Sequence, residues 1–145
     1  MAKENSRLMP NSHVTIFSSS ARGAGANNSN TITTHTSKGG IFWLEITAKS
    51  GTSPTLDVKL QGYDQDGGDW VDLGDNVAGT GAYAFSQKSS ISEPVRDQLT
   101  VYPGLTASGN AVCSGILPNQ FRAVATVGGS STPTVTFTLG VDLID

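Results

Sequence analysis

The densest group of potential ligand side chains is a run of aspartates between residues 64 and 75. A helix–loop–helix calcium loop takes oxygen ligands at positions 1, 3, 5 and 12 and needs glycine at position 6. Asp64, Asp66 and Asp75 fit positions 1, 3 and 12, but Gly68 stands at position 5 and Asp69 at position 6. Aspartate and glycine also build tight turns. We therefore expect a solvent-facing hairpin at this place, with calcium binding as the alternative.

Three other side chains have the chemistry of zinc ligands, namely His13, His35 and Cys113. None of them belongs to a pair with the short spacing of a zinc motif, such as Cys-x2-Cys or His-x3-His. A lone cysteine in a β-rich chain is more often a small buried apolar group. We expect no metal site.

The side chains that catalysis would need are not arranged in a known pattern. Ser114 lies in Cys-Ser-Gly, which is not the Gly-x-Ser-x-Gly turn of a serine hydrolase. Glu45 and Glu93 are the candidate carboxylates for a glycosidase pair, and nothing in the sequence pairs them. No glycine-rich segment has the form of a phosphate-binding loop. We expect a protein that is not an enzyme, with no catalytic residue, no cofactor and no small-molecule substrate.

The aromatic side chains offer two binding hypotheses. Trp43 alternates with Phe42 and Leu44, so it lies on the opposite face of a strand, either covered by a neighbouring segment or exposed as an anchor for another protein. Tyr63 and Trp70 flank the acidic turn. They are either a cross-strand pair or a platform on which a sugar ring stacks.

Two long segments with period-two patterning position these side chains. Residues 41–49 and 56–62 alternate apolar and polar side chains on either side of the turn residues 50–54. Residues 121–127 and 135–143 do the same on either side of residues 128–133. Alternation of this kind indicates strands with one buried face, and Gly with Pro indicates a turn. The sequence therefore predicts a hairpin over residues 41–62 and a second one over the last quarter of the chain.

The two predicted hairpins resemble each other at an offset of 79 residues. Phe42 corresponds to Phe121, and Pro54 corresponds to Pro133. Either two similar hairpins lie in the two sheets of a sandwich, or both segments converged on the same turn chemistry. Two copies are too few for a solenoid.

Shorter predicted strands complete an all-β chain. They cover residues 14–17, 31–33, 69–73, 82–85 and 98–102, with turn residues between them. Many short strands separated by turns are typical of a sandwich or barrel. We expect one antiparallel β-sandwich domain over residues 13–145, jelly-roll-like, with residues 18–40 as a long loop or edge region. Residues 1–12 have little to bury, so we expect an extended, flexible N-terminal arm.

Composition excludes several functional classes. The chain has 145 residues, 14% of them charged, a net charge of −3 and one cysteine. Few basic residues argue against binding of nucleic acid. No apolar run approaches the ~20 residues of a membrane span, and the first residues lack the apolar region of a signal peptide. A single cysteine forms no intrachain disulfide, which fits a reducing compartment.

Four segments resemble small β-sandwich virion proteins of tailed bacteriophages. They are residues 46–61, 66–73, the Val-Tyr-Pro-Gly segment 101–104, and residues 121–138, within a similarity over about residues 40–143. That family includes capsid decoration (cement) proteins and head or tail accessory proteins. The resemblance implies a β-sandwich or jelly-roll fold and carries no catalytic residues.

The resemblance implies a structural role in a virion. We expect a capsid decoration protein that binds the major capsid protein on the outside of the head shell as a homo-oligomer and is assembled in the bacterial host cytoplasm. The alternatives are a tail or head–tail accessory protein, or a carbohydrate-binding module that uses Tyr63 and Trp70. The N-terminal arm is the first predicted contact and Trp43 the second. The predicted interface residues are Lys3, Arg7, Leu8, Met9, Pro10 and Trp43.

Overall fold

The described part of the chain consists of β-strands joined by turns and irregular segments. A computed structural model describes residues 12–34, 37–74 and 82–145, and no helix occurs in these residues. The all-β prediction is confirmed. The strands are β2 (His13–Gly23), β3 (Gly25–Asn28), β4 (Ile32–Thr33), β5 (Gly39–Asp64), β6 (Asp69–Asp72), β7 (Val95–Tyr102), β8 (Val112–Ser114) and β9 (Gln120–Ile144).

The centre of the fold is a two-stranded ribbon made by β5 and β9. They pair antiparallel over almost their whole length, from Gly39 opposite Ile144 to Gly62 opposite Phe121. This corrects the two predicted hairpins. The two arms of each expected hairpin do not pair with each other, because each arm pairs with an arm of the other long strand. Local alternation cannot distinguish these pairings, since both bury the same face.

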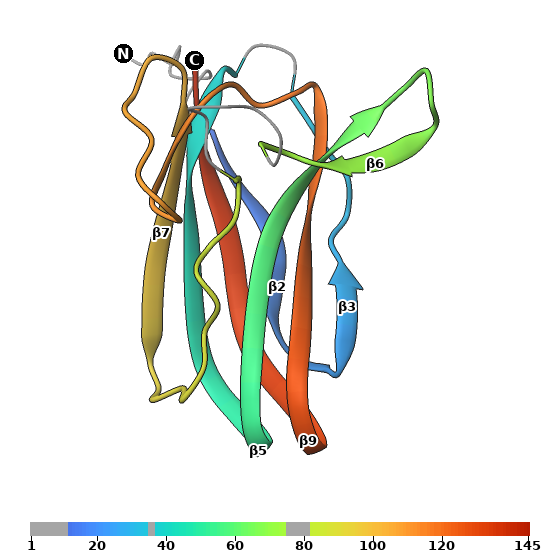
Figure 1. Ribbon diagram of the computed structural model, residues 1–145, viewed down its shortest axis with the longest axis vertical. Helices are drawn as coiled ribbons and strands as arrows, with labels where there is room; N and C mark the ends of the chain where they lie inside the picture. The colour runs from blue at the N-terminus through green and yellow to red at the C-terminus, as the bar shows by residue number, and fades with distance from the viewer. Residues whose placement is uncertain (1–11, 35–36, 75–81) are drawn as a thin grey trace, which may run out of the picture.

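The ribbon turns back on itself at its middle, where the sequence predicts turns. Gly51 and Gly129 have positive φ values of 91° and 122°, and the ladder register shifts between Ser50 and Thr55. A Cβ at Gly51 would lie 2.6 Å from Cα of Pro133, so this close crossing requires glycine. Figure 1 shows both long strands reversing direction at the lower end of the molecule.

The offset of 79 has a structural meaning, because it relates the two turns of the ribbon: Ser53 and Thr132, 79 residues apart, have similar positive φ values of 49° and 55°. Phe42 lies opposite Val141, and Phe121 lies opposite Gly62. Phe42 and Phe121 are also 79 residues apart, so they take equivalent places in the two halves of the ribbon. The equivalent rings of Phe42 and Phe121 contact each other edge to face, with centroids 6.0 Å apart. The ribbon therefore has an internal pseudo-two-fold relation, in which Phe42 and Phe121 are equivalent.

Shorter strands extend both halves of the folded ribbon. The first half-sheet consists of residues 39–50 of β5 and 134–144 of β9, flanked by β2 on β9 and by β7 on β5. β8 continues beyond β7 in parallel orientation, so the sheet is mixed and not purely antiparallel. The second half-sheet consists of residues 55–64 of β5 and 120–128 of β9, with β3 and β4 on β9 and β6 on β5. The two half-sheets belong to one hydrogen-bonded sheet of eight strands.

The segment expected as a long loop, residues 18–40, is largely strand where it is described. β2 continues to Gly23, and β3 and β4 follow it along β9. Backbone hydrogen bonds to β9 hold these residues, so they need few apolar side chains. The edge part of the prediction is confirmed, and the loop part is wrong. The predicted strand 82–85 forms only an isolated bridge, between Ala84 and Lys59.

The core lies between the inner faces of the ribbon halves and matches the predicted apolar positions with one exception. Ala48 is exposed, because it lies beside the turn. Cys113 is buried, donates a 3.2 Å hydrogen bond to the Ala82 carbonyl, and burial raises the pKa of its thiol to about 11. The buried apolar residues of the ribbon are Phe42, Leu44, Ile46, Leu56, Val58, Leu60, Phe121, Ala123, Val124, Ala125, Val127, Val135, Phe137, Leu139, Val141 and Leu143.

Candidate functional site

The largest exposed aromatic side chain is Trp43, on the outer face of the first half-sheet. The residue is 45% exposed, while its neighbours Phe42 and Leu44 point into the core. The register places Trp43 between Gln98 of β7 and Gly140 of β9. Its indole Nε1 donates a 2.8 Å hydrogen bond to Oδ2 of Asp142. The ring is therefore fixed by one edge and reaches solvent elsewhere.

Asp142 joins Trp43 to His13. Its Oδ1 lies 2.6 Å from Nδ1 of His13. The hydrogen bonds from His13, first, and from Trp43 hold the pKa of the Asp142 carboxyl below its usual range. A Cβ at Gly140 would lie 2.8 Å from Cε1 of His13. Gly140 lies opposite Trp43 in the ladder, and its lack of a side chain leaves the space that the His13 ring occupies.

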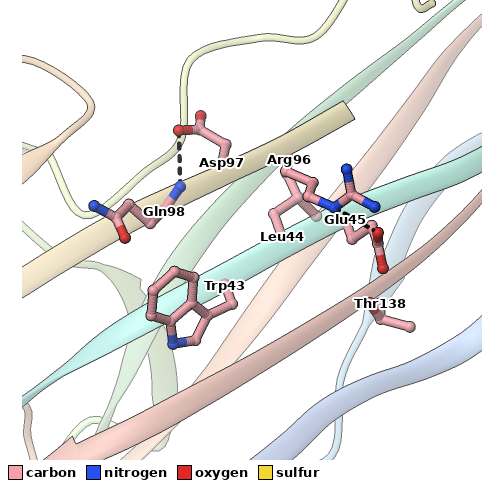
Figure 2. Close-up of a pocket in the computed structure, with 7 residues that line it drawn as sticks. All are labelled: Trp43, Leu44, Glu45, Arg96, Asp97, Gln98 and Thr138. Carbon is pink, nitrogen blue, oxygen red and sulfur yellow. Dashed lines mark hydrogen bonds and ion pairs between the residues drawn. The ribbon is translucent and has the colours of Figure 1, made fainter. Parts of the chain in front are cut away.

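Two open grooves lie on either side of Trp43. The larger, about 510 Å³, crosses β7, β5 and β9, and Figure 2 shows its seven lining residues on these strands. The smaller, about 360 Å³, lies toward β2 and includes His13, Thr15, Ser18 and Ser19. Trp43 and Thr138 line both grooves. The lining of the larger groove is Trp43, Leu44, Glu45, Arg96, Asp97, Gln98 and Thr138.

The charged side chains that line these grooves all have partners of opposite sign. Arg96 Nε lies 2.8 Å from Oε2 of Glu45. Lys88 Nζ lies 2.6 Å from Oδ2 of Asp97, and this pair is half-buried or more. His13 and Asp142 are hydrogen-bonded to each other, and the grooves combine these paired side chains with one exposed indole.

The second aromatic pair, Tyr63 and Trp70, lies on the second half-sheet. Their ring centroids are 5.1 Å apart, and the guanidinium carbon of Arg122 lies 4.4 Å from the centroid of Trp70. Arg122 Nε also donates a 2.9 Å hydrogen bond to Gln61. Gln61 and Lys59 in turn donate to Asp72. One face of Trp70 is thus occupied by Arg122 and is not free to stack on a sugar.

The acidic turn is the hairpin that the sequence predicts. β6 pairs with β5 from Gln61 opposite Asp72 to Asp64 opposite Asp69. Oδ1 of Asp64 accepts the backbone N–H groups of Asp66 and Gly67, each at 3.1 Å. This carboxylate therefore stabilises the turn itself. Asp75 lies outside the described residues, and no cluster of three or more potential metal-ligating side chains occurs within 12–34, 37–74 and 82–145.

The structure separates the remaining candidate residues. His13 lies on β2 and Cys113 on β8, at opposite ends of the strand order. Glu45 pairs with Arg96, and Glu93 precedes the cis-linked Pro94. His35 and the five predicted arm residues Lys3, Arg7, Leu8, Met9 and Pro10 lie outside the described part of the chain.

Sequence reasoning found Trp43 but missed the residues that surround it. Asp142 lies 99 residues away along the chain, and only the ladder register brings the two together. The signal that could have found Gly140 is its position as the one glycine among the outward-facing residues 134–142 of β9, which are mostly Thr. Nothing local in the sequence indicated that Gln98 and Thr138 line one groove.

Comparison with known proteins gives no family assignment for this chain. No family model matches it, and neither a curated protein nor a solved structure shows significant similarity. In the part of the chain that the structure describes, no helix is long and apolar enough to cross a membrane.

Proposed function

We propose that this chain is a non-enzymatic structural virion protein, a capsid decoration (cement) protein that binds the phage head shell and stabilises it. The observation that carries the proposal is the continuous β5–β9 ribbon, folded over a core whose largest side chains are fully buried. Such a module is suited to a mechanical role, because most of its residues serve one cooperative unit. We further propose that the folded ribbon is a jelly-roll-like β-sandwich.

The partner in this proposal is the major capsid protein, and the chain acts as a homo-oligomer. Many tethered copies need only modest affinity each, because binding at one site raises the effective concentration at the next. The strand order ends at β2 on one side, where the described residues show pairing with β9 alone. An edge of this kind supports strand addition to a neighbouring subunit.

The first proposed contact with the shell is the segment 1–12. It contributes two cations, Lys3 and Arg7, followed by the apolar run Leu8, Met9 and Pro10. The described chain begins at Ser12, whose carbonyl accepts the N–H of Leu143 next to β2. Ser12 therefore lies beside β2, at the end of the strand order. Trp43 is the second contact expected from the sequence, but we place the shell contact on the segment 1–12, because among the described residues the grooves beside Trp43 contain no other large exposed apolar side chain.

The test compares binding of the full chain and of a variant lacking residues 2–12 to undecorated shells of the parent phage. We expect co-sedimentation of the full chain, a higher disruption temperature of the decorated shells, and loss of both effects in the truncated variant. Undiminished binding of the truncated variant would remove the arm from the mechanism. The Val71→Ala variant, changed at an exposed position of β6, is a matched control that should bind normally.

A tail or head–tail accessory role is the alternative within the same class, since the same module serves either place. Electron microscopy of the assembled particle separates the two. Density for this chain on the head surface supports decoration, and density at the tail or the neck supports the alternative. Absence of this chain from the particle would contradict both roles.

A further inference from the structure

The outer face around Trp43 has a composition that a protein interface core does not have. Such a core gathers several apolar and aromatic side chains. Among residues 12–34, 37–74 and 82–145, the other large exposed apolar residues are Val71 on β6 and Leu105 and Ile116 in connecting segments, and none of these three lines the grooves beside Trp43. The face instead surrounds a single indole with hydroxyl and amide groups and with charged side chains that are already paired. This arrangement suits a ligand with one small apolar surface and many hydroxyls.

We propose that the Trp43 face binds a neutral oligosaccharide, with one pyranose ring stacked on the indole. A pyranose with equatorial hydroxyls exposes axial C–H bonds on its ring face, and these carry partial positive charge. The face of an indole carries partial negative charge, which attracts them. The hydrogen bond from Nε1 to Asp142 uses only the ring edge and fixes the side chain before a ligand arrives.

The polar groups beside Trp43 fit the hydroxyls of a sugar. Gln98 offers an amide that both donates and accepts, and Thr138 offers a hydroxyl in the same groove. On the other side of the indole, Thr15, Ser18 and Ser19 line the smaller groove. A sugar hydroxyl is likewise donor and acceptor, so it can match each of these groups. A few placed polar groups around an apolar surface are what fix orientation in ligand sites.

The charge distribution favours a neutral ligand over an acidic one. Glu45 pairs with Arg96 and Asp97 with Lys88, so the cations that line or support the larger groove are already bound to carboxylates. Asp142 is held in its charged form by its two hydrogen-bond donors. An anionic saccharide would meet these carboxylates without an unpaired cation to receive it.

The two grooves indicate a ligand longer than one sugar unit. They continue from either side of Trp43, toward β7 in one direction and toward β2 in the other. A linear chain crossing the strands would place one unit on the indole and others in the grooves. We therefore expect affinity to rise from the disaccharide to the hexasaccharide.

The experiment titrates the purified full chain with neutral hexasaccharides, namely cellohexaose, laminarihexaose, mannohexaose and xylohexaose, while the indole N–H resonances are followed by NMR. We expect at least one of them to bind and to shift the Trp43 signal. Trp43→Ala should weaken that binding about tenfold or more. Trp43→Tyr keeps an aromatic face and should retain most of it. Trp70→Ala is the matched control, because Arg122 already covers that ring, and it should bind as the unaltered chain does.

Three results would overturn the proposal. One is that no neutral hexasaccharide binds, and another is that Trp43→Ala, shown to be folded by circular dichroism, binds as before. The third is that hexagalacturonate binds more tightly than every neutral ligand. Light scattering of Trp43→Ala adds a readout, since a change of oligomeric state without a change in sugar binding would make Trp43 a contact between copies. All these measurements use the isolated chain, so their failure is separate from failure of shell binding.

Discussion

The two outer faces of the ribbon use equivalent positions, but one leaves its indole open to solvent and the other covers its indole with a cation. The offset of 79 that relates the ribbon halves places Trp43 at the position of Arg122, and Gly140 at the position of Gln61. On the first face the aromatic residue stands on the ribbon opposite a glycine. On the second face the ribbon contributes a cation opposite an amide, and the aromatic ring, Trp70, arrives from β6.

This difference decides which indole is available to a ligand. Arg122 lies over Trp70 and is itself held by Gln61, which donates to Asp72. The second face thus satisfies its own aromatic and charged groups. Trp43 has one hydrogen bond along its edge and a glycine opposite in the ladder. An aromatic ring on a sheet is therefore a candidate site only when its cross-strand neighbours leave its face uncovered.

The largest expected effect comes from the core contact between the two half-sheets. Phe121→Ala removes a fully buried ring that packs on its equivalent, Phe42. We expect the free energy of unfolding, measured by urea denaturation, to fall by about 3–5 kcal/mol, the usual loss for a buried phenylalanine. Val71→Ala, on an exposed side chain, should change it by less than about 0.5 kcal/mol.

A loss below about 1.5 kcal/mol for Phe121→Ala would contradict a ribbon folded over this aromatic pair. Trp70→Phe leaves Trp43 as the single tryptophan, and Trp43→Phe leaves Trp70. In each of these backgrounds, Phe121→Ala should increase quenching of the remaining indole by acrylamide. An effect on one indole alone would show that the two half-sheets do not share this support.

A smaller effect is expected from uncovering the second face. Arg122→Ala removes the cation over Trp70 and the hydrogen bond to Gln61. We expect a loss of about 1 kcal/mol in unfolding free energy, from the cation–π contact and its hydrogen bond together. In the Trp43→Phe background, acrylamide should also quench the fluorescence of Trp70 more strongly.

The matched control for that variant is Arg96→Ala, which breaks the exposed ion pair with Glu45 on the first face. Exposed pairs of this kind contribute about 0–1 kcal/mol, and we expect the lower end of that range. If Arg96→Ala destabilised the protein more than Arg122→Ala, the contrast between a covered and an open face would be wrong.

The sequence predicted the core and the turns because these depend on local patterning. Period-two alternation placed Phe42, Leu44, Phe121 and the other alternating apolar residues of the two long segments on buried faces, which the structure confirms for all of them except Ala48. The turn residues before Pro54 also lie where the ribbon reverses. Strand partners could not be predicted in the same way, because an arm buries the same face whether it pairs with its own neighbour or with β9.

One feature of the fold and one of the candidate site escaped prediction for physical reasons. Polar edge strands such as β3, Gly25–Asn28, are held by backbone hydrogen bonds, which leave no hydrophobic period in the sequence. The link between Trp43 and Asp142 depends on the register of a ladder that joins distant segments. The offset of 79 was visible in the sequence, and only the pairing showed that it relates two faces of one ribbon.

The smallest expected effect on stability tests why the first face is open. Gly140→Ala places a Cβ about 2.8 Å from Cε1 of His13, so the ring must move. His13 is exposed and starts a strand, so we expect a loss of less than about 1 kcal/mol in unfolding free energy, with displaced His13 and Trp43 ring signals in NMR spectra. Gly23→Ala, where an added Cβ meets nothing within 4 Å, should leave both signals unchanged. Unchanged signals in Gly140→Ala would mean that the glycine opposite Trp43 is not what makes room for the His13–Asp142–Trp43 arrangement. The openness of this face would then have to come from β7 and Gln98 instead.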